Sequence, residues 1–90
     1  MNILILNAGS SSLKYQVIEM PSENIKCAGL IERIGEIDAI FTHKIGKETY
    51  SEVLSISNHE EGLRKITSTL LNVKIGVINS VDEIKAVGHR

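Results

Sequence analysis

Residues 6–17 read LNAGSSSLKYQV, in which two apolar segments flank a cluster of Asn, Gly and Ser. The run before the cluster, Asn2–Asn7, is apolar without alternation, which is typical of a central strand covered on both faces. The run after it, Ser12–Ile18, alternates between apolar and polar residues and predicts a strand with one buried face. Together the two runs predict an antiparallel hairpin across the Gly-Ser turn.

The rest of the chain predicts four further strands, over residues 25–34, 39–45, 48–56 and 84–89. If the last strand lies parallel beside the first, the segment before it is a right-handed crossover connection. Asn7 and Arg90 then lie at strand ends on the same edge of the sheet. Open α/β sheets bind ligands at such an edge, so both residues are candidates for a site.

One helix is predicted in that crossover. Ser57 and Glu60 have the spacing of a capping box, so the helix is expected to begin there and to end near Asn72. Apolar residues recur at helical spacing from Leu63, at i+3 and i+7, and predict the face that packs on the sheet.

Composition narrows the class of protein. The chain has 90 residues, 42% of them hydrophobic, and a net charge of −1, which fits one small globular domain. It has no Trp and no run of Lys or Arg, so we expect no nucleic-acid partner. No apolar run approaches the roughly 20 residues that span a bilayer, so we expect no membrane partner. Cys27 is the only cysteine, which suits a reducing compartment and predicts a cytoplasmic protein.

The Gly-Ser turn has the residue types of a phosphate cradle. Gly9 lets the backbone turn tightly and lets a ligand approach closely. Ser10 and Ser12 supply hydroxyl donors, and the N–H groups of the turn can form an anion-binding nest. If the extended conformation begins near Ser10, Lys14 shares a face with both serines and adds a positive charge on their side. The next element is a strand rather than a helix, so the turn is not a P-loop.

The same residues have a purely structural explanation, which is the commoner one for this pattern alone. Asn, Gly and Ser are ordinary turn residues, and a lysine on a strand usually faces solvent. The histidines lack metal-ligand spacing: we expect His43 on a strand surface and His59 in the first turn of the helix. Cys27 is expected to be a small buried residue, and the acidic pair 60–61 favours the helix N-terminus.

Two segments, ILNAGSSSLKYQV at residues 5–17 and AVGHR at residues 86–90, resemble the N-terminal part of the acetokinase family. This family includes acetate and propionate kinases and belongs to the larger group of sugar kinases, actin and Hsp70. The resemblance implies an α/β fold, the start of a ribonuclease H-like or actin-like ATPase domain. Its mixed sheet has an N-terminal β-hairpin and one crossover helix. Residues 1–90 are then expected to be the N-terminal part of the first acetokinase domain of a longer protein.

The resemblance also implies roles for individual residues. Asn7 corresponds to the asparagine of the family's opening segment, which is linked to the magnesium–phosphate site. Ser10 and Ser12 correspond to serines near the transferred phosphate, and Lys14 to a lysine assigned to ATP binding. Arg90 corresponds to the arginine that holds the acetate carboxylate and the phosphoryl group. Asn7 and Arg90 are therefore the implied catalytic residues.

The implied reaction is the reversible phosphorylation of acetate by ATP, with Mg²⁺, to give acetyl phosphate and ADP. Acetate is already ionised at neutral pH, so catalysis depends on positioning and on positive charge rather than on a general base. Propionate kinase and a non-catalytic nucleotide-binding module of the same fold are the alternatives. The resemblance further implies a homodimer, and other family site residues beyond residue 90, so the chain alone is expected to be inactive.

Overall fold

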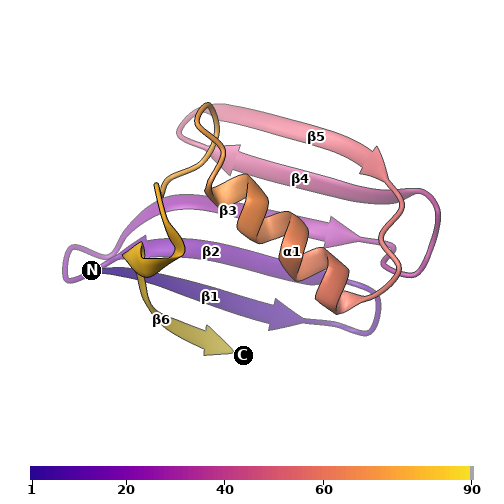
Figure 1. Cartoon of the computed structure of the whole chain (residues 1–90), viewed down its shortest axis with the longest axis horizontal. Coiled ribbons are helices and arrows are strands. Elements are labelled where there is room, and N and C mark those ends of the chain that lie inside the picture. The colour runs from indigo at the N-terminus through magenta and orange to yellow at the C-terminus, as the bar shows by residue number, and fades with distance from the viewer. Residues whose placement is uncertain (90) are drawn as a thin grey trace.

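The structure is a computed structural model that describes residues 1–89; Arg90 lies outside the described residues. The elements are β1 (Asn2–Ala8), β2 (Leu13–Glu19), β3 (Asn24–Glu32), β4 (Ala39–Ile45), β5 (Glu48–Leu54), α1 (His59–Leu70), the 3-10 helix η1 (Val81–Glu83) and β6 (Ile84–His89). The strands form one six-stranded sheet in the order β5-β4-β3-β2-β1-β6 (Figure 1). Only the β1–β6 pair is parallel among these strands, which confirms the predicted hairpin and parallel last strand.

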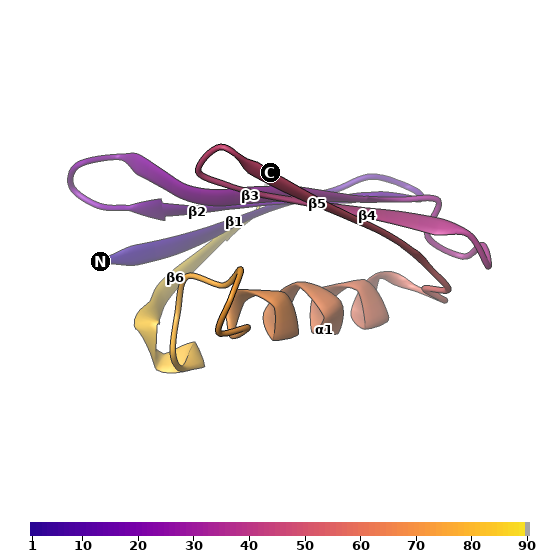
Figure 2. The same cartoon turned by 90° about the horizontal axis from the view of Figure 1, so that it is seen from above.

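The molecule has two layers, with α1 lying across one face of the sheet (Figure 2). No described element covers the other face, which corrects the expectation that the first strand is covered on both sides. Leu4 and Leu6 of β1 point toward the helix layer and are buried, whereas Ile3 and Ile5 on the opposite face are only partly buried. None of the helices among residues 1–89 has the length and apolar character needed to cross a membrane.

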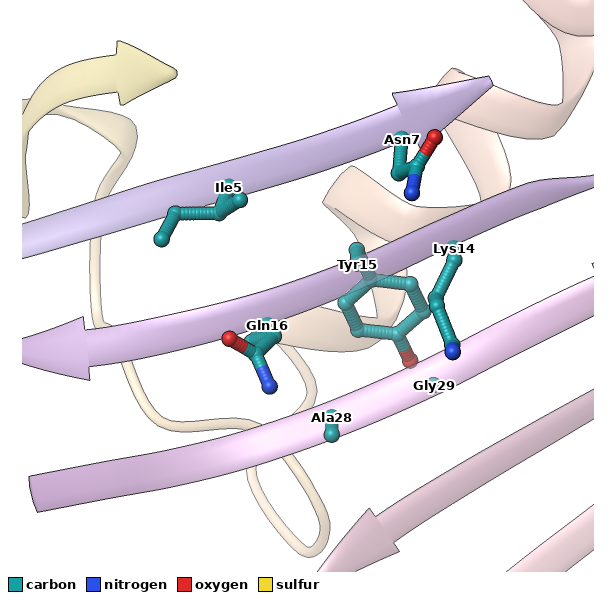
Figure 3. A pocket seen from close by; sticks show the side chains of 7 residues that line it. All are labelled: Ile5, Asn7, Lys14, Tyr15, Gln16, Ala28 and Gly29. Atoms are coloured by element: carbon teal, nitrogen blue, oxygen red, sulfur yellow. The ribbon is translucent and has the colours of Figure 1, made fainter. Parts of the chain in front are cut away.

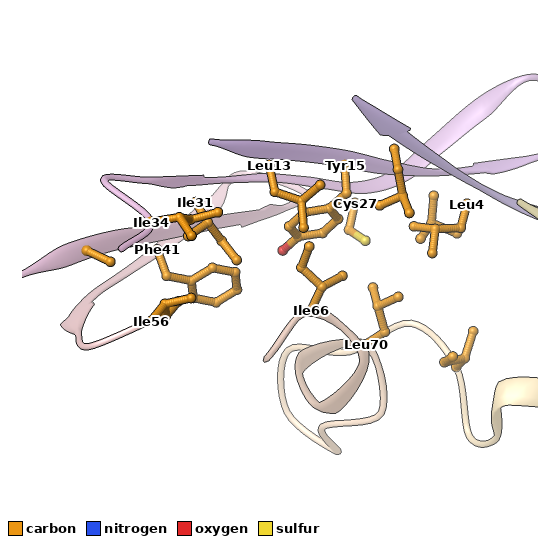
Figure 4. Close-up of a cluster of buried hydrophobic side chains, with 14 residues drawn as sticks. Leu4, Leu13, Tyr15, Cys27, Ile31, Ile34, Phe41, Ile56, Ile66 and Leu70 are labelled. Carbon is orange, nitrogen blue, oxygen red and sulfur yellow. The ribbon is translucent and has the colours of Figure 1, made fainter. Parts of the chain in front are cut away.

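The hydrophobic core lies between the sheet and α1. Tyr15, Ile31 and Phe41 reach it from three neighbouring strands, and Ile66 and Leu70 reach it from the helix (Figure 4). The alternation of β2 accounts for this arrangement, because every second residue of that strand points toward α1. Cys27 of β3 is buried in the same core, as predicted, and this burial raises the pKa of its thiol to about 11.

The helix begins one residue later than predicted. Asn58, not Ser57, is the N-cap, and its side-chain oxygen accepts a hydrogen bond of 2.8 Å from the Glu61 N–H. Glu61 in turn accepts the Ser57 N–H at 3.4 Å. Capping residues at both 57 and 58, each with a glutamate three positions later, make the two starts nearly equivalent in sequence. The structure selects the second start.

The buried face of α1 is also rotated from the predicted one. Gly62 is buried there, and a Cβ at its position would contact side chains of Ile31, Ile34 and Leu13 at 3.4–3.7 Å. The missing side chain lets the helix approach the sheet closely at this point. Leu63, predicted to belong to the core face, is consequently 38% exposed.

His43 is fully buried, which contradicts its predicted place on a strand surface. It lies on β4 opposite Gly29, and the Tyr15 ring crosses over that glycine from β2 to reach it. The Tyr15 hydroxyl bonds Nδ1 of His43, and Nε2 donates to the carbonyl oxygen of Ile75 at 2.8 Å. A buried imidazole is tolerated here because both ring nitrogens are paired.

Candidate functional site

The turn between β1 and β2 is formed by Gly9–Ser12, which we call the serine turn. Ala8 pairs with Leu13, so four residues close the hairpin, and the Gly9 N–H donates to the Ser12 carbonyl at 3.0 Å. A Cβ at Gly9 would lie only 2.6 Å from Ser12 Oγ. A side chain at Gly9 would therefore require the Ser12 side chain to move, and no left-handed backbone demands glycine at this position.

Most carbonyl groups of the serine turn are bonded to donors of the protein. The Ser11 oxygen accepts the Ile34 N–H at 2.9 Å. The oxygens of Gly9 and Ser12 both accept from Nε2 of His59, at 2.8 and 3.1 Å. Three of the four carbonyls of the turn thus point at protein donors, and their partial negative charges are compensated.

The donor groups of the three serines in the turn differ from these carbonyls. Within residues 1–89, the N–H groups of Ser10, Ser11 and Ser12 meet no acceptor, and their hydroxyl groups have no hydrogen-bond partner. Ser10 and Ser11 are exposed and Ser12 is half-buried. N–H and hydroxyl groups without protein acceptors are the groups that bind anions at such turns.

Lys14 and Asn7 extend this patch along the sheet. They are cross-strand partners on β2 and β1 and lie side by side on the face opposite α1 (Figure 3). A cavity of about 210 Å³ opens between them and is also lined by Ile5, Gln16 and Ala28. In the described part of the chain, Lys14 makes no ion pair, so its charge is available to a ligand.

A second cavity of about 270 Å³ lies on the far side of Lys14 and reaches Lys44 on β4. The described residues contain no group of three or more His, Cys, Asp or Glu side chains that could enclose a metal ion. Among these residues, Asn7 is the sequence-predicted metal ligand, and it offers a single amide oxygen.

The predicted site residues are thus largely brought together. Asn7, the serine turn and Lys14 adjoin one another at the carboxyl end of β1. β6 runs parallel to β1 with Leu6 opposite His89, so it approaches the same edge. Arg90, which was predicted to be catalytic, lies outside the described residues. His59 lies in the first turn of α1, as expected, but its contact with the serine turn was not predicted.

The sequence model of the acetokinase family matches residues 2–90. The chain belongs to the acetokinase family. It is 48% identical over 91 residues to acetate kinase 2 of Clostridium perfringens and 46% identical over 90 residues to acetate kinase of Thermotoga maritima. Each alignment covers 100% of this chain but only 23% and 22% of the respective relative. This acetokinase-family chain therefore spans less than a quarter of the length of the curated relatives it matches.

Solved structures confirm the fold class. A crystal structure of Porphyromonas gingivalis acetate kinase superposes with a TM-score of 0.95 at 34% identity, over 99% of this chain and 23% of that one. A propionate kinase from Francisella tularensis superposes with a TM-score of 0.83 at 26% identity, over 99% of this chain and 22% of that one. The mixed sheet with its hairpin and crossover helix is part of the actin-like fold of these kinases.

Proposed function

We propose that the chain forms the phosphate-binding part of an acetate kinase, which transfers the γ-phosphoryl group of ATP reversibly to acetate. The observation that carries the proposal is the one-sided pairing of the serine turn: three of its four carbonyls are bonded, while the N–H and hydroxyl groups of its three serines have no partner among residues 1–89. The uncompensated charge of Lys14 lies beside it. Such a surface favours a multiply charged anion over a neutral ligand.

Each candidate residue then has a distinct task. The free N–H groups and hydroxyls of Ser10 and Ser12 hold phosphate oxygens, and Gly9 leaves room for their approach. Lys14 offsets phosphate charge as a point cation. The Asn7 amide oxygen fits a Mg²⁺ ion that keeps most of its waters and shares the substrate phosphates. Mg²⁺ bound there would neutralise further charge on ATP.

The reaction requires no proton transfer. A carboxylate oxygen of acetate attacks the γ-phosphorus, and the bond to the β–γ bridging oxygen breaks, so that ADP leaves with that electron pair. The barrier arises from bringing two anions together, and positioned cations lower it. Arg90 is assigned to the acetate carboxylate and the phosphoryl group on the family resemblance, since its guanidinium can bond either group with two parallel hydrogen bonds.

The proposal extends to the protein of which this chain is a part. We assign residues 1–90 to the N-terminal part of the first acetokinase domain of a longer enzyme, because the curated relatives are more than four times as long. That this enzyme is a homodimer is proposed on the family resemblance, and that it is cytoplasmic on the single cysteine of this chain. The remaining part of the cleft would then come from later residues. The 90 residues alone are expected to release no ADP in response to acetate.

The test uses the full-length gene product. ADP release is measured with ATP and Mg²⁺ while the acid is varied among acetate, propionate and butyrate. Stimulation by acetate above the other acids supports the proposal, and stronger stimulation by propionate would make the enzyme a propionate kinase, the activity named for one structural neighbour. ATP binding without stimulation by any acid would indicate a nucleotide-binding module instead.

Lys14→Ala and Lys44→Ala form a matched pair for the same assay. Both lysines are exposed on the same face of the sheet, but only Lys14 follows the serine turn and pairs with Asn7. Loss of a charge-assisted contact predicts that kcat/KM for ATP falls about 10- to 100-fold in Lys14→Ala. Lys44→Ala is expected to retain the wild-type value. Equal effects of the two changes would remove Lys14 from the site.

A further inference from the structure

His59 joins two segments that are nearly fifty residues apart. Its Nε2 lies 2.8 Å from the Gly9 oxygen and 3.1 Å from the Ser12 oxygen, at the two ends of the serine turn. Carbonyl oxygens only accept hydrogen bonds, so Nε2 carries the proton and donates to both. The ring is half-buried between the start of α1 and the turn. One side chain thus determines the direction of two peptide groups.

Peptide geometry gives this contact a consequence for the ligand. In a planar trans peptide the C=O and the following N–H point in opposite directions. Because the Gly9 carbonyl points at His59, the N–H of Ser10 points away from it. The Ile34 N–H acts in the same way on the Ser11 carbonyl, and so directs the N–H of Ser12. The N–H groups of Ser10 and Ser12 are therefore oriented by the bonds made to the carbonyls that precede them.

We propose that His59 is a positioning residue for the phosphate-binding turn. Its Nε2–H holds the Gly9 and Ser12 carbonyls on the helix side, so that the Ser10 N–H faces the bound phosphate and these two carbonyl dipoles point away from it. This inference rests on the proposed function. His59 itself need not touch the ligand.

The neighbouring charges do not compete for this role. Glu60 bonds Arg64 at 2.7 Å, and Glu61 accepts the Ser57 N–H. Neither carboxylate forms a hydrogen bond with the serine turn within the described residues. His59 is therefore the only side chain of the first turn of α1 with a hydrogen bond to the turn, as far as residue 89.

Two substitutions distinguish two possible roles of His59: orienting the peptide groups of the serine turn, and only anchoring the start of α1. His59→Gln keeps an N–H donor at the reach of Nε2, whereas His59→Asn keeps the amide but places it too near the backbone to span the gap. The Kd of the full-length protein for MgATP is measured by titration calorimetry, and the melting temperature of each variant is recorded. Glu60→Gln, in the same helical turn, is the control that leaves the contact intact.

We expect Kd to rise about tenfold in His59→Asn, the factor that corresponds to one hydrogen bond of ordinary strength. His59→Gln should stay close to the wild-type Kd, and Glu60→Gln should match it. An unchanged Kd in His59→Asn, even with a lowered melting temperature, would overturn the inference, because His59 would then only anchor the helix. An equal rise in both His59 variants would also overturn it, since the donor would not matter.

The inference and the proposed function can fail separately. If the wild-type protein binds MgATP but shows no acid-dependent ADP release, the kinase proposal fails, while the Kd ratios of the variants still decide the role of His59. If the wild-type protein binds no MgATP, both are overturned. If acetate stimulates ADP release and the His59 variants bind MgATP like the wild type, only the inference falls.

Discussion

Gly29→Ala is expected to destabilise the chain by about 1–6 kcal/mol, although it adds only one methyl group. A Cβ at this position would lie closer than 3.0 Å to Cε1, Cζ and Oη of Tyr15, a distance that real Cβ contacts essentially never show. The Tyr15 ring is 1% exposed and its hydroxyl is bonded to His43, so it has no free space into which it can swing.

Three terms set the magnitude. Forcing the ring aside in a packed core costs about 1–3 kcal/mol. Breaking the bond to His43 leaves a buried Nδ1 without a partner, which costs about 1–3 kcal/mol more. Replacing glycine by alanine restricts the unfolded chain and returns about 0.4–1 kcal/mol. The first two terms exceed the third, so the sign of the net effect is destabilising.

Urea unfolding followed by circular dichroism measures the effect. Gly88→Ala is the matched control, because a Cβ there would meet only Ile5 Cγ1 at 3.9 Å. The cost of Gly29→Ala should also shrink in a Tyr15→Leu background, which removes the ring that it displaces. If Gly29→Ala unfolds within about 0.5 kcal/mol of Gly88→Ala, the close crossing of Tyr15 over Gly29 is refuted.

Two further predictions test other parts of the structure. Asn58→Ala should lower the free energy of unfolding by about 1 kcal/mol, and Ser57→Ala should lower it by much less, since only Asn58 caps α1. If Ser57→Ala shows the larger loss in the same urea assay, the helix begins one residue earlier than the structure shows. The free energy of unfolding should be highest below pH 9.0 and should fall as the pH rises through about 11. The reason is that burial raises the pKa of Cys27 to about 11 and also raises the pKa of Tyr15. Between these pH values the native chain keeps protons that the unfolded chain releases. Urea midpoints that stay constant through this pH range would contradict the raised pKa values. So would urea midpoints of Cys27→Ala that depend on pH as strongly as those of the wild type.

Features of this chain that depend on neighbouring residues in sequence could be predicted well. The alternation after the serine turn gave the buried face of β2, and the short apolar run at residues 84–89 gave the last strand. The helix start was displaced by one residue because two cap formers stand in a row. That Asn7, Lys14 and the turn between them lie together could also be predicted, since they belong to one continuous segment; their roles as site residues stay a prediction.

Features that depend on tertiary contacts could not be predicted in this way. The burial of His43 requires a glycine on the adjacent strand and a tyrosine two strands away. The rotated face of α1 depends on the space left by Gly62 rather than on an apolar side chain. His59 gave no local signal at all, because its two acceptors lie 47 and 50 residues earlier in the chain.

The serine turn therefore has donor geometry that its own sequence does not encode. Its carbonyls are held by His59 and Ile34, and His59 is placed by the docking of α1 on the sheet. Gly62 takes part in that docking and packs near Leu13, the residue that immediately follows the turn. A packing defect at the helix–sheet contact should consequently disturb anion binding even though no ligand-contacting residue has changed. The short segment NAGSSSLK supplies the donors, but their direction depends on His59 of α1, about fifty residues later in the chain.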